Sequence, residues 1–144
     1  MAEFKPTPSQ KLAIEDRGGE LLVSAAAGSG KTRVLTERLM AYLTDAENPV
    51  DIDRFLVITY TRAAAAELRS RILDGIYARI ASDPENRRLR RQVALCARAE
   101  IGTIHSFCAD FLRANCAALA LAPDFQVADT ERCAALRAAA LEHT

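Results

Sequence analysis

Apolar residues along this chain follow two patterns, short continuous runs and longer runs with helical spacing. A short continuous run between turn-forming residues is typical of a strand buried in a sheet. The predicted strands are residues 21–24, 55–60 and 101–104. The predicted helices are a short one capped by Thr7 or Ser9 that ends near Asp16, and then residues 32–44, 62–81, 86–99, 106–120 and 130–142. Strands that alternate with helices indicate an α/β fold with a mostly parallel sheet and flanking helices.

Length and charge exclude several classes of protein. The chain has 144 residues, 50% of them hydrophobic, which suits one globular domain. No apolar run is long enough for a transmembrane helix, so no membrane partner is expected. The formal net charge is zero, but residues 62–98 hold nine arginines against four acidic residues, so an anion-binding surface should be local. The last predicted helix runs to the end of the chain without a stop signal, so we interpret the chain as truncated.

The four cysteines have spacings that fit neither a zinc site nor a compact disulfide framework, and only two histidines accompany them. We interpret them as thiols buried on helices. The first ten residues show no signal peptide, so a reducing cytoplasm is the expected location.

The segment Ala25–Thr32, AAAGSGKT, lies between a predicted strand and a predicted helix, where a phosphate-binding loop of the Walker A type belongs. Small residues let successive backbone N–H groups point at phosphate oxygens, and the helix adds the positive end of its dipole. The residues expected to contact the nucleotide here are Ala25, Ala26, Ala27, Gly28, Ser29, Gly30, Lys31 and Thr32. Ala25 stands where the strict pattern has Gly, and a glycine-rich turn that caps a helix is the alternative.

Two residues of this loop have the chemistry that catalysis requires. Lys31 is the only lysine after position 11 in a chain whose other basic residues there are all arginine. Its compact ammonium group suits the β- and γ-phosphates of a nucleotide better than the planar guanidinium of arginine. Thr32 supplies a hydroxyl ligand for Mg²⁺. Upstream, the amide of Gln10 is able to pair with the edge of adenine by donating and accepting together, although it also suits an exposed helix position.

Five blocks of sequence, taken in order, resemble the start of the UvrD/Rep-type superfamily 1 DNA helicases. The likeness is greatest to the AddA-type helicase–nuclease subunit, which is related to RecB. The blocks are F-x-P-T-x-x-Q-x-x-A-I (4–14), SAAAGSGKTRVL (24–35), ITYTRAAAAELRSRI (58–72), GTIHSFC (102–108) and PDFQVAD (123–129). The resemblance implies an incomplete RecA-like P-loop fold. Residues 1–120 would belong to the ATP-binding domain (1A), and residues 121–144 would begin the inserted helical 1B subdomain.

The resemblance also implies roles for single residues. Gln10 would read adenine, and Arg33 would lie near it. Tyr60 would stack on a base of single-stranded DNA, with Thr61 and Arg62 binding phosphate. Thr103 and His105 would touch the DNA backbone. From the residues alone, Tyr60 also fits a core aromatic and His105 a structural histidine.

Other residues leave alternatives open. The arginines of the segment 87–91 fit a DNA-facing patch or a solvated helix face paired with Asp83 and Glu85. No apolar strand ends in the Asp-Glu pair of a Walker B motif, and no arginine finger is recognisable. We therefore expect this chain to bind ATP–Mg²⁺ and single-stranded DNA without hydrolysing ATP by itself.

The parent protein implied by the resemblance is an ATP-dependent 3′–5′ DNA helicase that carries a nuclease further along its chain. It would act on DNA ends in double-strand-break repair together with an AddB-like partner subunit. Two other classes remain as hypotheses, a P-loop small-molecule kinase or phosphotransferase, and a non-catalytic DNA-binding module. Loss of DNA binding on replacing Tyr60 would separate the helicase hypothesis from the kinase hypothesis.

Overall fold

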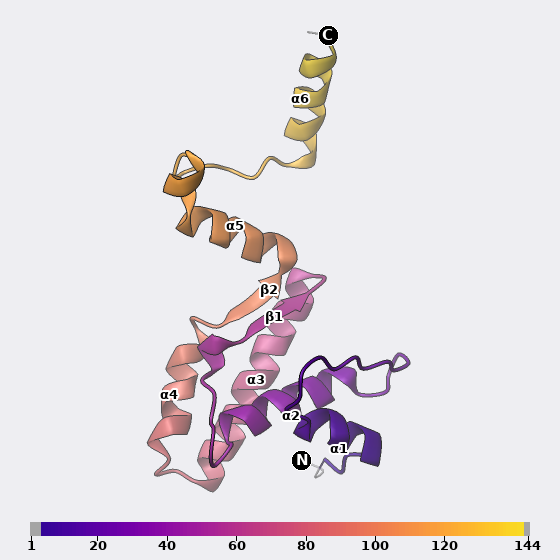
Figure 1. The fold of residues 1–144 in the computed structure, drawn as a ribbon, viewed down its shortest axis with the longest axis vertical. Coiled ribbons are helices and arrows are strands. Elements are labelled where there is room, and N and C mark those ends of the chain that lie inside the picture. Colours follow the sequence, from indigo (N-terminus) through magenta and orange to yellow (C-terminus); the bar gives the residue numbers. More distant parts are fainter. Residues whose placement is uncertain (1–3, 143–144) are drawn as a thin grey trace. The chain divides into compact units, whose positions relative to one another are not determined.

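The computed structural model describes residues 4–142 in two compact units, of which the first ends at Thr103 and the second begins at Ile104. The first unit holds α1 (Pro8–Glu15), α2 (Lys31–Leu43), the 3₁₀ turn η1 (Ile52–Arg54), β1 (Leu56–Thr59), α3 (Arg62–Ser82), α4 (Arg87–Cys96) and β2 (Glu100–Thr103). The second unit holds α5 (Ile104–Ala114), the 3₁₀ turn η2 (Cys116–Leu119) and α6 (Thr130–Glu142). Figure 1 labels the α-helices and the two strands.

The sheet of the first unit has two parallel strands, β1 and β2, with Val57 opposite Ile101. Neighbouring residues of a strand point to opposite faces, and only one face is covered here. Val57 and Ile101 are buried on the side of α3, whereas Leu56 and Ile58 are about half exposed. The predicted parallel arrangement of the strands is confirmed, but β1 is less buried than its continuous apolar run predicted.

The core of the first unit lies between α2, α3, α4 and the sheet (Figure 1). On α3, Leu68, Ile72 and Ile76 recur every four residues, so their side chains share one face and are buried together. Met40 and Leu43 of α2 pack into the same core. The helical spacing in the sequence predicted both helices, and the structure confirms them with ends within one residue of those expected.

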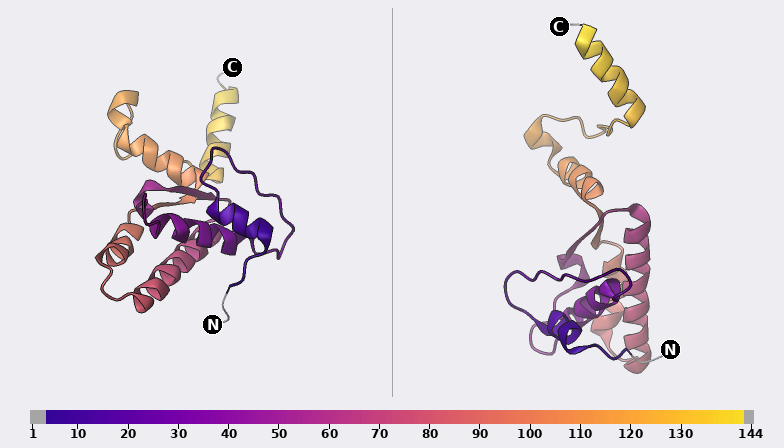
Figure 2. Two further views of the ribbon diagram at one scale, coloured as in Figure 1. Left: turned by 60° about the horizontal axis from the view of Figure 1, so that its bottom comes forward. Right: turned by 90° about the vertical axis from the view of Figure 1, so that its right-hand side faces the viewer.

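Residues 21–24 are not a strand, which corrects the sequence prediction. The segment is part of the coil that connects α1 to α2 (Figure 2), and Leu22 is 94% exposed. Apolar composition favours burial, but a strand also needs a neighbour for its N–H and C=O groups. In the described residues the sheet consists of β1 and β2, and neither pairs with this segment.

The predicted helix over residues 106–120 is also different in the structure. It begins two residues earlier and ends at Ala114, and η2 follows it. The side-chain amide of Asn115 donates to the Phe111 carbonyl (2.8 Å) and so competes with the backbone hydrogen bonds of a longer helix. Ala120 has a left-handed backbone (φ 52°), which a continuing helix does not allow. Short side-chain hydrogen bonds of this kind are hard to predict from apolar spacing.

The cysteines differ in burial more than the sequence analysis predicted. Cys96 is buried at the end of α4, and burial raises the pKa of its thiol. Cys108 is exposed, and Cys116 and Cys133 are half-buried, so the prediction of buried thiols holds only for Cys96. All four are free cysteines in the structure. None of the helices in residues 4–142 combines the length and hydrophobicity that a bilayer crossing requires.

Gln92 is a fully buried polar side chain that joins α4 to the segment before β1. Its Oε1 accepts from the Ile52 N–H (2.9 Å), and its Nε2 donates to Asp51 Oδ1 (2.8 Å). The hydrogen bond from Gln92 is the main reason that the pKa of Asp51 lies below its ordinary value of 3.8, with the nearby guanidinium groups of Arg88 and Arg91 acting in the same direction.

Replacing Gln92 by leucine is expected to lower the free energy of unfolding by about 2 kcal/mol, because the buried Ile52 N–H loses its acceptor. A carboxyl whose pKa is lowered by folding adds stability that is present above pH 3.8 and is lost as pH falls through the folded pKa. In Gln92→Leu the loss of stability between pH 7 and pH 3 should therefore be smaller than in the unmodified chain. Urea unfolding followed by circular dichroism at pH 7 and at pH 3 measures both effects.

The matched control is Gln126→Leu, because Gln126 is exposed. Equal unfolding curves for the two variants at pH 7 would show that the buried Gln92 contacts do not stabilise the fold.

Candidate functional site

The loop before α2 has the backbone that phosphate binding requires. Gly28 (φ 76°) and Gly30 (φ 84°) both lie in the left-handed region, which glycine adopts without steric cost. Gly30 is the N-cap of α2, so the first N–H groups of that helix open toward the loop. The turn is closed by Ser29, whose hydroxyl donates to the Ala26 carbonyl (2.8 Å).

Lys31 folds back over this loop from the first position of α2. Its Nζ donates to the carbonyl of Ala25 (2.8 Å) and to that of Ala26 (2.7 Å). The ammonium group therefore lies beside the backbone of the loop, where an anion bound by the loop would meet it. A phosphate would take over these two hydrogen bonds with a stronger, charge-assisted pair.

Gln10 connects α1 to the same loop. Its Oε1 accepts from the Thr7 N–H (2.9 Å), and the Thr7 hydroxyl accepts from the Gln10 N–H (3.3 Å), which completes a capping box. The Nε2 of Gln10 donates to the Ser29 carbonyl (3.2 Å). Two blocks that lie far apart in the sequence, around Gln10 and around Lys31, therefore meet at one place in the fold.

An open cavity of about 360 Å³ lies where these elements meet. It is lined by Thr7, Ser9, Gln10, Ala13, Val23, Ser24, Ala25, Ser29, Lys31 and Val34. The donors and the lone ammonium group around it suit a polyanion, and the apolar side chains of Ala13, Val23 and Val34 suit a planar base. No group of three His, Cys, Asp or Glu side chains in residues 4–142 is arranged to hold a metal ion. A metal at Thr32 would therefore depend on the ligands that a nucleotide supplies.

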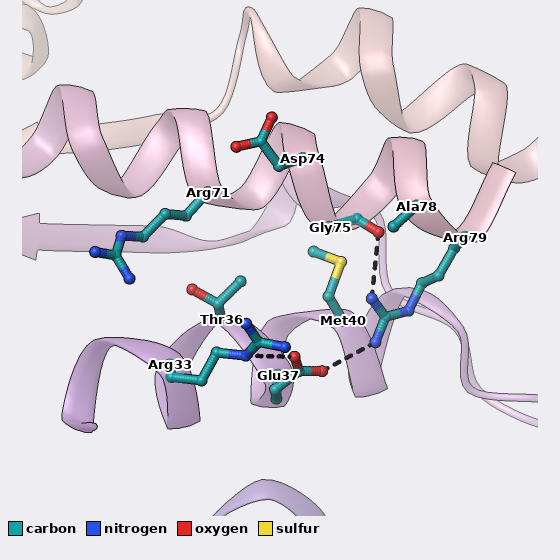
Figure 3. A pocket seen from close by; sticks show the side chains of 9 residues that line it. All are labelled: Arg33, Thr36, Glu37, Met40, Arg71, Asp74, Gly75, Ala78 and Arg79. Carbon is teal, nitrogen blue, oxygen red and sulfur yellow. Dashed lines mark hydrogen bonds and ion pairs between the residues drawn. The ribbon is translucent and has the colours of Figure 1, made fainter. Parts of the chain in front are cut away.

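Arg33 lies on another face of α2 and does not line this cavity. Its Nε donates to Glu37 Oε1 (2.9 Å), and its guanidinium carbon is 5.0 Å from the centre of the Phe4 ring. Figure 3 shows the cavity of about 250 Å³ that Arg33 does line, between α2 and α3. Glu37 also accepts from Arg79 of α3 (3.1 Å), so this side of α2 is tied to α3.

Most of the predicted DNA-contacting residues lie at the carboxyl end of the sheet. Tyr60 follows β1 directly and is fully exposed, so it does not fill core space. Thr61 caps α3 by accepting from the Ala64 N–H (3.1 Å), and Arg62 is the first residue of that helix. Thr103 ends β2 opposite Thr59, and parallel strands end at the same edge of a sheet. His105 belongs to the second unit, where it is an exposed residue in the first turn of α5.

The arginines of the segment 87–91 are bound mostly by the protein itself. Arg88 NH1 pairs with Asp51 Oδ1 (2.8 Å), and Arg91 NH2 pairs with Asp51 Oδ2 (3.3 Å). Arg90 donates to the Pro84 carbonyl. The helix α4 leads into the amino end of β2, whereas Tyr60 follows the carboxyl end of β1, so the cluster and Tyr60 belong to opposite ends of the sheet. The geometry favours a structural role, with Asp51 as the acceptor that the sequence analysis did not identify.

The amino-acid sequence matches a known family along almost its whole length. Residues 6–144 fit the family model of the UvrD/REP helicase N-terminal domain. The chain belongs to the UvrD/REP helicase family.

Several curated relatives are AddA-type proteins, each named as one subunit of an ATP-dependent helicase/nuclease. The chain is 53% identical over 125 residues, 87% of its length, to the protein of Thermoanaerobacter sp. (strain X514). It is 49% identical over 136 residues to that of Clostridium acetobutylicum (94% of this chain) and 46% identical over 142 residues to that of Clostridioides difficile (99% of this chain). It spans about a tenth of the length of these relatives, 10% of the first and 11% of the other two.

These matches confirm the predicted resemblance to UvrD/Rep-type helicases and to the AddA type. The relatives are named as ATP-dependent enzymes, and the mixed helix and strand structure is consistent with an α/β helicase domain.

Proposed function

We propose that this chain is the ATP- and DNA-binding N-terminal part of a helicase/nuclease subunit of the AddA type. One observation supports this most directly: Gln10 and Lys31 come from separate sequence blocks, yet both line one cavity beside a loop with two left-handed glycines. A glycine-rich turn that only caps a helix would not need either side chain there.

ATP–Mg²⁺ would be held at this cavity. The backbone of residues 25–30 and the Lys31 ammonium group would bind the phosphates, Gln10 would contact the base, and the Thr32 hydroxyl would be a ligand of the metal. Mg²⁺ held there would neutralise negative charge on the phosphates. Arg33 would approach the nucleotide only after it leaves Glu37, to which it is bound in this structure.

Single-stranded DNA would run along the carboxyl edge of the sheet. Tyr60 presents a fully exposed ring on which a base is able to stack, and Thr61, Arg62 and Thr103 lie at the same edge. The contact of His105 with the DNA backbone stays a prediction that rests on the family resemblance.

The remaining expectations extend this proposal to the parent protein. Residues 1–120 would form part of a RecA-like ATP-binding domain with a P-loop fold, and residues 121–144 would begin a helical insertion. The parent would move 3′–5′ along DNA, act on DNA ends in double-strand-break repair in the cytoplasm, and work with an AddB-like partner subunit. These 144 residues would bind ATP without turning it over, because no strand in their sequence ends in an Asp-Glu pair.

A titration of ATP–Mg²⁺ into the chain, with phosphate release recorded in the presence and absence of single-stranded DNA, tests the proposal. We expect saturable binding, lost in Lys31→Ala, and no turnover. Turnover that depends on Lys31 would show that the chain supplies the hydrolytic residues itself. Absence of nucleotide binding would contradict the proposal for this chain.

A further inference from the structure

One arginine of α2, Arg38, joins α2 to α1. Arg38 comes from α2, and its NH1 donates to the carbonyl of Ala13 in the last turn of α1 (2.6 Å). The last carbonyls of a helix have no partner within that helix, and the negative end of the helix dipole lies there. A guanidinium group at this place therefore satisfies an acceptor and complements the dipole.

Tyr42, one turn further along α2, completes the junction. Arg38 NH2 donates to the Tyr42 hydroxyl (3.2 Å). Arg17, which follows α1, lies with its guanidinium carbon 4.2 Å from the centre of the Tyr42 ring and donates to the Ile14 carbonyl (2.7 Å). Two arginines thus bind neighbouring carbonyls of α1 and both contact one aromatic ring of α2.

The short helix α1 has little else to hold it. It spans 8 residues, and Ala13 is its one buried residue. Isolated helices shorter than roughly 12 residues are marginal in water, so α1 depends on its tertiary contacts. Gln10 lies three residues before Ala13, on the side of α1 that lines the cavity with it.

We propose that Arg38 is a positioning residue for nucleotide recognition, which holds α1 against α2 so that Gln10 stays beside the phosphate loop. This inference rests on the proposed function. The contacts of Arg38 are with Ala13 and Tyr42, and Gln10 reaches the loop through one hydrogen bond, to the Ser29 carbonyl. Loss of Arg38 should therefore act mainly on recognition of the base and leave binding of the phosphates to Lys31. A lysine would satisfy the Ala13 carbonyl, but its single nitrogen would not reach Tyr42 at the same time, as the second nitrogen of the guanidinium group does.

The test compares ATP with inorganic tripolyphosphate, each with Mg²⁺, by calorimetric titration into the chain. In Arg38→Met we expect about tenfold weaker ATP binding, which corresponds to the loss of roughly two hydrogen bonds to the base. Binding of tripolyphosphate should stay within about twofold of that of the unmodified chain. Arg38→Lys should restore part of the ATP affinity. Arg71→Met is the matched control, because Arg71 pairs with the exposed Glu67 on α3 and should leave both ligands unchanged.

Equal losses for ATP and tripolyphosphate in Arg38→Met would overturn the inference, because Arg38 would then support the phosphate loop as a whole. Unchanged ATP binding in a folded variant would overturn it too. Thermal unfolding by circular dichroism identifies variants that do not fold. If Arg38→Met does not fold, Tyr42→Phe takes its place in the comparison, because it removes only the hydroxyl that accepts from Arg38.

Hydrogen exchange separates failure of this inference from failure of the proposed function. The amides of Lys11 and Asp16 are bonded within or at the end of α1, to the carbonyls of Thr7 and Leu12. In Arg38→Met they should exchange faster while the Thr44 amide at the end of α2 stays protected. If these amides exchange faster in Arg38→Met but the unmodified chain binds no ATP, Arg38 still positions α1 and only the proposed nucleotide binding is refuted. Unchanged exchange would refute the role of Arg38.

Discussion

Lys31→Ala is expected to weaken binding of ATP–Mg²⁺ by about a hundredfold or more. The ammonium group lies over the loop, 2.8 Å from the Ala25 carbonyl and 2.7 Å from the Ala26 carbonyl, where the phosphates would replace these acceptors. Two hydrogen bonds that join charged groups contribute about 1.5–3 kcal/mol each, which corresponds to a factor of this size. Isothermal titration calorimetry at fixed Mg²⁺ concentration measures the change.

The fold should not change in this variant. Lys31 is exposed, and the two carbonyls that it leaves become free to bind water. Thermal unfolding should therefore occur at the same temperature as in the unmodified chain. Lys11→Ala is the control for loss of one positive charge, because Lys11 forms only an exposed ion pair with Glu15 at 3.8 Å.

Lys31→Arg distinguishes a general need for positive charge from a need for a compact one. We expect little recovery, since a planar guanidinium does not fit the space between the loop carbonyls as an ammonium group does. If Lys31→Ala binds ATP as tightly as the Lys11→Ala control does, the loop does not bind the phosphates through Lys31.

The second large effect is expected at Tyr60. Replacing Tyr60 by alanine should weaken binding of single-stranded DNA by roughly tenfold to a hundredfold, because stacking of a base on an aromatic ring contributes about 1–3 kcal/mol. The ring of Tyr60 is fully exposed, so the substitution removes no core contact and should leave stability and ATP binding unchanged. Fluorescence anisotropy with a labelled oligothymidine at one fixed salt concentration measures the affinity.

Two variants sharpen this measurement. Tyr60→Phe keeps the ring and should keep most of the affinity. Tyr77→Ala removes another exposed tyrosine, 54% exposed on α3, which lies away from the carboxyl edge of the sheet, and should have little effect. If Tyr60→Ala and Tyr77→Ala bind DNA equally well, the carboxyl edge is not the DNA-binding surface, and a small-molecule phosphotransferase becomes the better hypothesis.

Much of the site could be predicted from the sequence because its signals are local. The loop from Ala25 to Thr32 is one continuous segment, and the backbone angles of Gly28 and Gly30 agree with the conformation that their residue type favours. The Thr7 cap of α1 and the helical spacing on α3 are also local, and the structure confirms both.

The contacts that arrange the site could not be predicted in the same way. Arg38 and Ala13 are 25 residues apart, and Gln92 and Asp51 are 41 apart, so no periodicity links them. The pair Arg33 and Glu37 has the i,i+4 spacing of a helical ion pair and could have been found in the sequence. The hydrogen bond that Arg79 of α3 donates to Glu37 could not be found in this way, since it depends on how the two helices pack.

The sequence by itself determined the approximate positions of the helices, the position of the glycine-containing loop before α2 and the family to which the chain is similar, because these properties depend on residue type and short-range spacing. Only the tertiary structure decided that residues 21–24 remain coil, that Asp51 binds Arg88 and Arg91, and that Arg38 holds α1 beside the loop. The physical reason is the same in each case. Pairing of a strand, burial of a charge and docking of a short helix all depend on partners that the chain brings close only when it folds.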